Sequence, residues 1–435
     1  MNYIGLDIGT TTICAVCLDE EGHLLYSNTL QNSSNIEGKA FEALQSPHDI
    51  LDSCRQLIAE IIGQFNAIAA IGISNQMHGI LYIDKSGTAL SPLFTWQDER
   101  GNLYHEAEET YCRRLSRITG YPMATGYGLT THYYNSINSC IPDGAVKLCT
   151  IGDYIAMQLC GTNAPRIHPS NAASLGLFNI KTKQFDAAAL KKANIDTEIL
   201  PDITSVEEII GITDSGIPVR TAIGDNQASV FGSLSSNSDI HINIGTSSQI
   251  SIVTDNIATS ASLECRPYLL DKYLLVGAPL CGGYSYRILK DFFAEAAVML
   301  GINELDSIYE KMNEAGLEAY SSNVEGLSFD TRFRGTRNEP QLRASVTGIS
   351  PSNFKPGNLI VALLRGICEE LHECFSSIPN VQEKKGPICA SGNGVRLNPL
   401  MPRLLEDTFG RSIIIPDSRE DASTGAAKAA MLALK

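Results

Sequence analysis

No hydrophobic run in the sequence approaches the roughly 20 apolar residues of a membrane-spanning helix. Basic residues are also in deficit, because 33 Lys and Arg stand against 48 Asp and Glu, for a formal net charge of −15. Nucleic acids and anionic membrane surfaces bind clustered basic side chains, so we expect neither as a partner. With 43% hydrophobic and 19% charged residues, the chain is predicted to be a soluble globular protein.

The N-terminus has no basic region leading into an apolar signal segment, because Tyr3 already opens a predicted strand. The 12 cysteines are scattered, and many stand in apolar runs. This usage suits reduced thiols, so a cytoplasmic location is expected. Cys14 and Cys17 form a Cys-x-x-Cys pair, but their odd separation within a strand directs the side chains to opposite faces, which argues against a metal or redox site.

What the chain does have is length. Its 435 residues exceed what one hydrophobic core normally supports, so two domains are expected. An antiparallel meander over residues 3–30 precedes alternating strands and helices, a pattern typical of two α/β domains of ribonuclease-H-like topology. We place the first domain at residues 1–220 and the second at residues 221–435.

One strand–turn–strand pattern occurs twice, at residues 3–18 and 241–254. Backbone N–H groups and hydroxyls in such a turn can cradle phosphate oxygens, and a carboxylate before the turn can hold the metal ion that accompanies a nucleotide. A single turn of this kind is more often structural, but its repetition favours two phosphate grips. The two copies are Asp7, Gly9, Thr10, Thr11 and Thr12 in the first, and Asn243, Gly245, Thr246, Ser247 and Ser248 in the second.

Gln76, Met77 and His78 follow a short buried strand predicted at residues 68–73. Chemistry in open α/β sheets gathers at strand ends, so these residues form a candidate substrate loop. A lone histidine beside a strand is more often structural, and that alternative stays open for His78.

Trp96, the single tryptophan, stands two residues before Asp98. An aromatic plate beside a carboxylate is a common pairing in sugar sites, so both are candidate substrate ligands. Alternatively, Arg100 is the ion-pair partner that holds Asp98.

Asp225 follows Gly224 at the end of a strand predicted at residues 217–223 and precedes a helix start. A carboxylate at that place can reach a bound hydroxyl, which makes Asp225 a candidate general base and the adjacent Asn226 a candidate substrate ligand. The structural alternative is that Asp225 only caps the helix.

Three segments carry expectations of local structure. Residues 104–120 are predicted to be helical, and residues 121–134 are expected to form a loop. Residues 165–177 are predicted to be a loop at the domain interface, in which Ser170, Asn171 and Ala172 line the sugar pocket.

Taken together, these motifs resemble the FGGY carbohydrate kinases of the actin-like ATPase superfamily, along almost the whole chain. The resemblance implies transfer of the γ-phosphoryl of ATP to a sugar, with Mg²⁺, in a ligand cleft between a sugar-binding first domain and a nucleotide-binding second domain. It makes Asp225 the catalytic aspartate and places Asp7 and Asp225 at the metal. The stretches that carry it are residues 7–12, 72–79, 95–100, 224–229 and 390–399.

The resemblance also places Gly392, Asn393 and Asn398 at the nucleotide, although Ser391 and Asn393 stand where the family usually has glycines. The Trp-Gln-Asp stretch resembles the sedoheptulokinases of the family most and the xylulokinases next. It therefore implies a ketose phosphorylated at its terminal primary hydroxyl, with sedoheptulose converted to sedoheptulose 7-phosphate.

Other readings remain open at this point. Xylulose, ribulose, gluconate and glycerol are alternative acceptors, and a homodimer is left open. A non-enzymatic actin-like or chaperone-like ATPase would share the phosphate turns but would not need the loop at Gln76. A sugar-sensing repressor would need an added helix-turn-helix segment, which we do not expect before residue 3.

Overall fold

The computed structural model divides the chain into two compact units. Unit 1 comprises Met1–Gly232, Arg266–Tyr273 and Ser418–Lys435, and unit 2 comprises Ser233–Cys265 and Leu274–Asp417. The first segment of unit 1 ends beyond the expected boundary near residue 220, and the end of the chain returns to unit 1. The structure describes residues 1–106, 108–204, 208–234, 238–258, 260, 262–302, 306–322, 326–336, 339–378, 381, 384–416 and 420–432.

Unit 1 is built around a mixed seven-stranded sheet. Its strands are β1 (Asn2–Ile8), β2 (Thr12–Leu18), β3 (Leu24–Gln31), β6 (Ile68–Asn75), β16 (Ile209–Ile212), β17 (Pro218–Arg220) and β18 (Ile223–Gly224). The order is β16-β17-β6-β1-β2-β3, with β18 also paired to β6. The antiparallel meander β1-β2-β3 is confirmed, and β6 runs parallel to β1.

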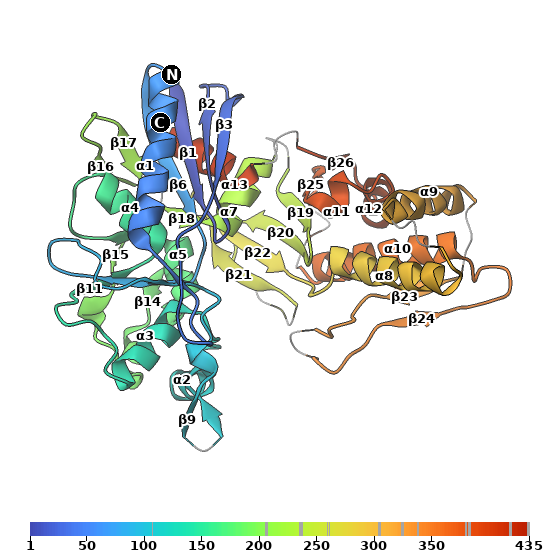
Figure 1. Cartoon of the computed structure of the whole chain (residues 1–435), viewed down its shortest axis with the longest axis horizontal. Coiled ribbons are helices and arrows are strands. Elements are labelled where there is room, and N and C mark those ends of the chain that lie inside the picture. The colour runs from blue at the N-terminus through green and yellow to red at the C-terminus, as the bar shows by residue number, and fades with distance from the viewer. Residues whose placement is uncertain are drawn as a thin grey trace. The chain divides into compact units, whose positions relative to one another are not determined.

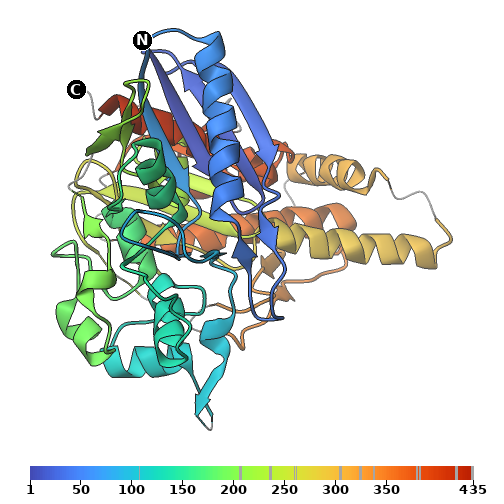
Figure 2. The same cartoon turned by 60° about the vertical axis from the view of Figure 1, so that its left-hand side comes forward.

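Helices cover both faces of this sheet (Figures 1 and 2). The helices α1 (Pro47–Gln64) and α4 (Ile151–Leu159) share a core with Leu6 and the other residues of β1 that point to their side. The opposite face carries α13 (Asp421–Leu432), which packs on β1 and β6. This approach is so close that a Cβ on Gly5 would lie 1.9 Å from the Ser423 carbonyl oxygen. The predicted last helix therefore exists, but it belongs to unit 1.

Cys14 and Cys17 of β2 lie on opposite faces of the same sheet. Cys14 packs in the cluster that contains Ala427 of α13, and Cys17 packs in the cluster that contains Ile50 of α1. The predicted opposite orientation of these side chains is confirmed. All 12 cysteines lie in described residues, and all are free thiols.

The rest of unit 1 consists of short strands and helices that stand beside the main sheet. The strands are β4 (Asn35–Ile36), β5 (Leu44–Gln45), β7 (Leu81–Ile83), β8 (Leu93–Phe94), β9 (Tyr104–Glu106), β10 (Glu109–Thr110), β11 (Lys147–Cys149), β12 (Arg166–Ile167), β13 (Phe178–Asn179), β14 (Gln184–Phe185) and β15 (Asp202–Ile203). The helices are α2 (Tyr111–Thr119), α3 (Gly128–Ile137), α5 (Pro169–Leu175), α6 (Ala187–Lys192), α7 (Asp225–Ser233), η1 (Arg100–Asn102) and η2 (Thr197–Ile199).

Three of the local predictions are wrong. Residues 104–120 are a hairpin of β9 and β10 followed by α2, rather than one helix. Residues 121–134 include the start of α3, and residues 165–177 include α5. Gly, Thr and Tyr have weak intrinsic helix propensity, so burial decides instead. Leu129 and Tyr133 of α3 and Leu175 of α5 all lie in one hydrophobic cluster.

Unit 2 contains a six-stranded sheet of order β21-β22-β20-β19-β25-β26. Its strands are β21 (Glu264–Pro267), β22 (Tyr273–Gly277), β20 (Ser248–Thr254), β19 (Ile240–Ile244), β25 (Ile388–Ser391) and β26 (Ile413–Ile414), and a separate pair is β23 (Ser328–Asp330) with β24 (Ser345–Thr347). Its helices are α8 (Gly283–Met299), α9 (Ile308–Ser321), α10 (Pro356–Ser376), α11 (Asn393–Arg396) and α12 (Met401–Phe409).

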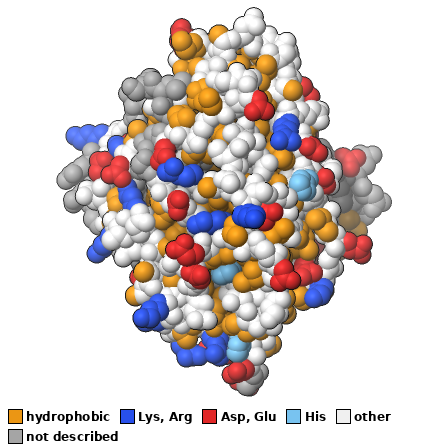
Figure 3. All heavy atoms as spheres, turned by 90° about the vertical axis from the view of Figure 1, so that its left-hand side faces the viewer, with side chains coloured by type: hydrophobic (Ala, Val, Ile, Leu, Met, Phe, Trp, Pro, Cys, Tyr) orange, Lys and Arg blue, Asp and Glu red, His pale blue; other side chains and the backbone are white. Residues whose placement is uncertain are grey.

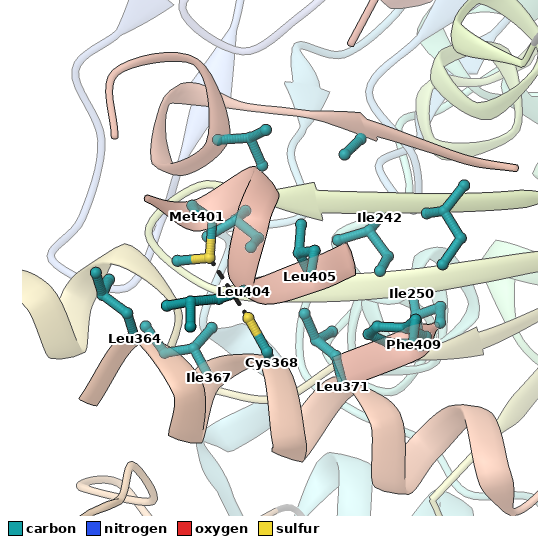
Figure 4. Close-up of a cluster of buried hydrophobic side chains, with 14 of the residues drawn as sticks. Ile242, Ile250, Leu364, Ile367, Cys368, Leu371, Met401, Leu404, Leu405 and Phe409 are labelled. Carbon is teal, nitrogen blue, oxygen red and sulfur yellow. Dashed lines mark hydrogen bonds between the residues drawn. The ribbon is translucent and has the colours of Figure 1, made fainter. Parts of the chain in front are cut away.

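The core of unit 2 lies between this sheet and the helices α10 and α12 (Figure 4). Ile242 and Ile250 extend from the central strands toward Leu371 and Leu405 on the two helices. The Cys368 thiol lies 3.6 Å from the Met401 sulfur, within this apolar cluster. Burial of this cluster holds the first strands of unit 2 against α10, as burial holds β1 against α1 in unit 1.

Acidic and basic side chains are intermingled over the face drawn in Figure 3. Among the described residues, every helix is too short or too polar to cross a lipid bilayer.

Candidate active site

Each main sheet contains a hairpin whose three-residue turn carries the predicted phosphate contacts. In unit 1 the turn connects β1 to β2, and the Gly9 N–H donates to the Thr12 carbonyl at 2.9 Å. In unit 2 the turn connects β19 to β20, and the Gly245 N–H donates to the Ser247 carbonyl at 2.9 Å. The exposed hydroxyl-bearing residues of the two turns are Thr11, Thr12, Thr246 and Ser247.

The residue before each turn is held by a serine on the neighbouring parallel strand. Asp7 is paired in register with Ser74 of β6, whose hydroxyl donates to Asp7 Oδ1 at 2.7 Å. Asn243 is paired in register with Ser391 of β25, and its Nδ2 donates to the Ser391 hydroxyl at 3.0 Å. The predicted duplication is therefore confirmed in strand pairing and in side-chain contacts.

Asp225 begins α7 directly after β18. Its Oδ1 accepts from the Asn226 backbone N–H at 2.6 Å, so the residue is partly used at the helix start, as the structural alternative expects. The Gly224 N–H donates to the Ser170 hydroxyl at 3.1 Å. A Cβ on Gly224 would lie 2.8 Å from the Met77 sulfur, so Met77 packs against the residue directly before Asp225.

Ser170, Asn171 and Ala172 support this strand end and are buried rather than lining a pocket. Asn171 Nδ2 donates to Asn75 Oδ1 at 2.8 Å and to the Ala222 carbonyl at 3.1 Å, which ties α5 to the ends of β6 and β18. The expectation that these three residues line the sugar pocket is corrected accordingly. Their amide and hydroxyl groups satisfy strand-end backbone that would otherwise be buried without partners.

Burial and neighbouring charges perturb both candidate carboxylates. Burial raises the pKa of Asp225 to about 7, and the negative charge of Asp7 adds to the increase. Burial likewise raises the pKa of Asp7 to about 6, against the hydrogen bond from Ser74 and together with the charge of Glu420. Two buried like charges are costly without a compensating cation, so this is a natural place for a divalent metal ion.

Two charged residues near this pair carry no motif that marks them. Arg266 of β21 donates from Nη1 to Asn226 Oδ1 at 3.1 Å, and its charge lowers the pKa of Asp225. Glu420, directly before α13, raises the pKa of Asp7. Both come from segments that are distant in sequence and return to unit 1, so only the fold reveals them. Asn226, a predicted substrate ligand, is thus oriented by Arg266.

His78 is held in a strained conformation beside the acceptor loop. Its φ of 74° lies in the left-handed region, which a residue with a side chain seldom adopts. Its backbone N–H and its Nδ1 contact the hydroxyl and the carbonyl of Ser174 at 3.1 and 2.7 Å. A carbonyl can only accept, so Nδ1 carries a proton in this contact. The ring stacks on Tyr127 with a centroid separation of 4.7 Å.

Trp96, Thr10 and Gln76 form a connected group. The Trp96 side chain is large and 47% of the residue is exposed, whereas Gln76 is buried. Trp96 Nε1 donates to the Thr10 hydroxyl at 2.9 Å, and that hydroxyl donates to Gln76 Oε1 at 3.0 Å. The single hydroxyl proton of Thr10 is thereby used. Unlike Thr11 and Thr12, Thr10 has no hydroxyl proton left to give to a phosphate, which differs from the expectation.

Asp98 has no surface to offer a sugar. It is 0% exposed, and its two oxygens accept from Arg100 Nε at 2.6 Å and Nη2 at 3.1 Å. The alternative prediction, in which Arg100 holds Asp98, therefore fits the structure, and we withdraw Asp98 as a substrate ligand. Arg100 also donates to Asn135 Oδ1 at 2.5 Å and lies over the Phe94 ring, which anchors the loop that carries Trp96.

Unit 2 contains a cavity of about 520 Å³ beside its phosphate turn. Leu364, Ile367 and Met401 form an apolar part of its wall, and these residues extend from the core shown in Figure 4. The N-terminal end of α8 meets the turn, where the Gly283 N–H donates to the Gly245 carbonyl at 2.8 Å. The remaining lining residues include Thr246, Tyr284, Tyr286, Tyr309, Asn393, Gly394 and Asn398.

Three predicted nucleotide residues lie at this cavity or directly beside it. Asn393 and Asn398 line it, and Gly392 precedes them with a φ of 89° and so close to Ile244 that a Cβ would lie 2.5 Å from its carbonyl oxygen. Asn398 Oδ1 accepts from the Leu400 N–H at 3.0 Å. Burial raises the pKa of Tyr286, and a hydrogen bond with the Asn398 side chain opposes that rise, so the two side chains lie together at the cavity. A cavity with apolar and amide side chains in its wall suits an aromatic base.

Comparison with known proteins places this architecture in a class. The chain matches the crystal structure of xylulose kinase from Rhodospirillum rubrum with a TM-score of 0.84 at 18% identity, covering 100% of this chain and 90% of that one. The fold is thus that of the two-domain carbohydrate kinases. The profile described as the FGGY family of carbohydrate kinases, N-terminal domain, matches residues 2–232, and its C-terminal counterpart matches residues 241–434.

The chain therefore belongs to the FGGY family of carbohydrate kinases, phosphotransferases whose acceptor is an alcohol group. Human sedoheptulokinase is 27% identical over 469 residues, covering 98% of this chain and 96% of that protein. Gluconokinase from Bacillus subtilis (strain 168) is also 27% identical, over 451 residues, covering 97% of this chain and 86% of that protein. Both similarities extend over nearly the whole chain.

Proposed function

We propose that this protein transfers the γ-phosphoryl group of ATP to the terminal primary hydroxyl of a ketose, with sedoheptulose as the first candidate. The observation that carries the proposal is the place of Asp225. It stands at a strand end beside Asp7, directly in front of the acceptor-loop residue Met77, and its pKa is raised to about 7. A carboxylate with that pKa suits a general base at neutral pH.

In the proposed reaction, Asp225 accepts the proton of the attacking hydroxyl while the sugar oxygen forms a bond to the γ-phosphorus. The bond from that phosphorus to the oxygen bridging it to the β-phosphate breaks, and ADP leaves. Met77, packed against Gly224, holds the backbone of Asp225 from behind. Because Gly224 has no side chain, Met77 can pack directly against its backbone.

Asp7 and Asp225 are the residues that would hold Mg²⁺. Carboxylate oxygens are the ligands that this ion prefers, and its charge would offset the effect that the Asp7 charge has on Asp225. When bound, Mg²⁺ neutralises the phosphate oxygens during transfer. Ser74 orients one oxygen of Asp7, which leaves the other oxygen for the ion.

The acceptor would be bound in unit 1 by Gln76, His78, Trp96 and Asn226. The half-exposed Trp96 ring gives a flat wall for an extended sugar chain. A pocket that pairs each hydroxyl rejects sugars lacking it, since an unpaired buried polar group costs about 1–3 kcal/mol. The preference for sedoheptulose rests on the similarity to human sedoheptulokinase and on the Trp96 loop.

The nucleotide would be bound in unit 2. Its base would enter the cavity lined by Leu364, Ile367 and Met401, where Asn398 contributes an amide side chain. In this unit the phosphates would contact the exposed Thr246 and Ser247 of the turn after β19.

A coupled assay of ADP release tests the proposal with sedoheptulose, xylulose, ribulose, gluconate and glycerol as acceptors and ATP as donor. The expected result is the highest kcat/KM for sedoheptulose. A clear preference for a pentulose or for gluconate, the substrate in the name of the Bacillus subtilis relative, replaces the acceptor while the kinase function stands. If none of the five acceptors causes ADP to be released, the proposed function as a whole is contradicted.

A further inference from the structure

A closed ring of hydrogen bonds joins the first phosphate turn to the acceptor loop through Gln45. No motif marks this residue, which ends the short strand β5 and is 1% exposed. Its Nε2 donates to the Thr10 backbone carbonyl at 2.8 Å, and its Oε1 accepts from Gln76 Nε2 at 2.8 Å. The Thr10 hydroxyl closes the ring by donating to Gln76 Oε1 at 3.0 Å.

The direction of each bond in this ring follows from two groups that each have a single role. The Thr10 carbonyl can only accept, so Gln45 must present its nitrogen there and its oxygen to Gln76. Gln76 must then present its nitrogen to Gln45 and its oxygen to the Thr10 hydroxyl. At the other end, the Trp96 indole can only donate, and it donates to that hydroxyl at 2.9 Å. All donors therefore run in one sense, an arrangement in which hydrogen bonds strengthen one another.

The ring leaves Gln76 with a defined face for an acceptor. One hydrogen of its Nε2 and one lone pair of its Oε1 are used inside the ring, so one of each remains. If Gln45 were apolar, the Gln76 carboxamide could rotate by 180° and exchange donor for acceptor. Thr10 would then lose the partner that ties its backbone carbonyl to β5.

We propose that Gln45 is a positioning residue for phosphoryl transfer: it fixes the polarity of Gln76 toward the acceptor and couples the acceptor loop to the phosphate turn at Thr10. This inference rests on the proposed kinase function, because it assigns Gln76 to the acceptor. Gln45 itself is buried behind the two segments and acts through them.

The first test compares Gln45→Leu with Gln158→Leu. Gln158 is a matched control, because its Nε2 also donates to a backbone carbonyl at 2.8 Å, that of Gly87, outside the ring. Trp96 is the only tryptophan, so its emission reports on the ring in the ligand-free protein. We expect Gln45→Leu to shift this emission and to raise the KM for sedoheptulose, with xylulose run in parallel, by about tenfold or more. Gln158→Leu should leave both unchanged.

The second test is Gln45→Glu, which also covers the case that Gln45→Leu does not fold. An ionised Glu accepts from Gln76 but sets an oxygen against the Thr10 carbonyl, whereas the protonated acid donates to that carbonyl and restores the ring. The ratio of kcat/KM of this variant to that of the wild type should therefore rise as the pH is lowered. If Gln45 only supports the fold, the Tm of this variant depends on pH, but the ratio measured where both proteins are fully folded does not.

The outcomes separate the two ideas. Unchanged Trp96 emission and unchanged acceptor KM in Gln45→Leu, or a pH-independent ratio in Gln45→Glu, overturn the role of Gln45 even if the wild type is an active kinase. A wild type that phosphorylates no acceptor overturns the proposed function, and the emission of the ligand-free variants still decides whether the ring exists.

Discussion

Asp7 raises the pKa of Asp225, although the two residues lie at opposite ends of the N-terminal half of the chain. They meet because both strands that precede them pair with β6. Asp7 is in register with Ser74, and Gly224 is in register with Asn75, so both carboxylates arise at the same end of parallel strands. Such strand ends are where open α/β sheets bind ligands.

Asp225→Asn should retain binding of ATP and sugar but lose about 10²–10⁴-fold in kcat, because the amide cannot accept the hydroxyl proton. Steady-state kinetics with separately measured ligand affinities check this result. Asp153→Asn is the matched control: Asp153 is another buried carboxylate of unit 1 whose pKa burial raises to about 7, but it bonds Thr150 at the start of α4. A variant of Asp225 within a few-fold of the wild-type rate removes the residue from the chemistry.

The rate should depend on pH through the same carboxylate. Asp225 accepts a proton only when it is ionised, and burial with the charge of Asp7 raises its pKa to about 7, so kcat/KM should rise with pH through that value. A bound divalent cation stabilises the ionised forms, so saturating Mg²⁺ should move the midpoint to lower pH. A rate that is flat from about pH 6 to about pH 8 at low Mg²⁺ argues against this assignment.

Stability should show the opposite dependence. The pKa of Asp225 is raised from an ordinary value of 3.8 to about 7, so the folded state keeps a proton that the unfolded state has released. The stabilisation this provides is complete below the unfolded pKa and is lost as the pH rises through the folded pKa. Asp225→Asn removes this titration, so its Tm should exceed that of the wild type increasingly from about pH 4 to about pH 7 and by a constant amount above.

Asp186 offers a control of opposite sign for this measurement. Hydrogen bonds from the Ala189 backbone and the Tyr121 hydroxyl lower its pKa, so its contribution is present at neutral pH and is lost as the pH falls. Asp186→Asn should therefore be less stable than the wild type at neutral pH and approach it in acid. If the Tm difference from the wild type changes with pH in the same direction for both variants, the stated environment of Asp225 is contradicted.

Asp7→Asn should raise the Mg²⁺ concentration needed for half-maximal activity by about tenfold or more, while the KM for sugar changes little. The substituted amide oxygen can still accept from Ser74, so the strand contact at 2.7 Å is retained and the loss is confined to charge. Magnesium titrations at saturating sugar provide the measurement. If the sugar KM rises and the Mg²⁺ requirement does not, Asp7 belongs to the acceptor side.

Much of this arrangement follows from short-range sequence patterns. The two phosphate turns, the strand before Gln76 and the helix that Ser46 opens at α1 all depend on local periodicity and turn chemistry, which a sequence displays directly. The repeat adds a second copy of the same pattern, and Asp7 with Ser74 and Asn243 with Ser391 make matching contacts in the two copies.

Contacts made by distant segments could not be predicted in the same way. Arg266 and Glu420 approach Asp225 and Asp7 only because residues 266–273 and α13 return to unit 1. For Asp98 the sequence prediction is wrong: its motif suggests a substrate ligand, but the side chain is fully buried in an ion pair. Its neighbour Arg100, two positions along, satisfies both oxygens, and nothing in the residue types distinguishes an ion pair from a sugar contact.

The nucleotide cavity of unit 2 gives a prediction that separates ATP binding from sugar binding. Asn398→Asp keeps the oxygen that accepts from the Leu400 N–H and replaces the Nδ2 donor at the cavity with an acceptor. A base that pairs with that donor would then face a like dipole or a charge, so the KM for ATP should rise by about tenfold, with little change for sugar.

Asn353→Asp is the matched control for Asn398→Asp. Asn353 is also a buried asparagine of unit 2, but its Oδ1 accepts from the Ser350 N–H and its Nδ2 donates to the Gly348 carbonyl, away from the cavity. We expect this control to lower the Tm, because it sets an oxygen against a carbonyl, and to leave the KM for ATP unchanged. Equal effects of the two substitutions on that KM would mean that Asn398 supports the fold of unit 2 and does not contact the nucleotide.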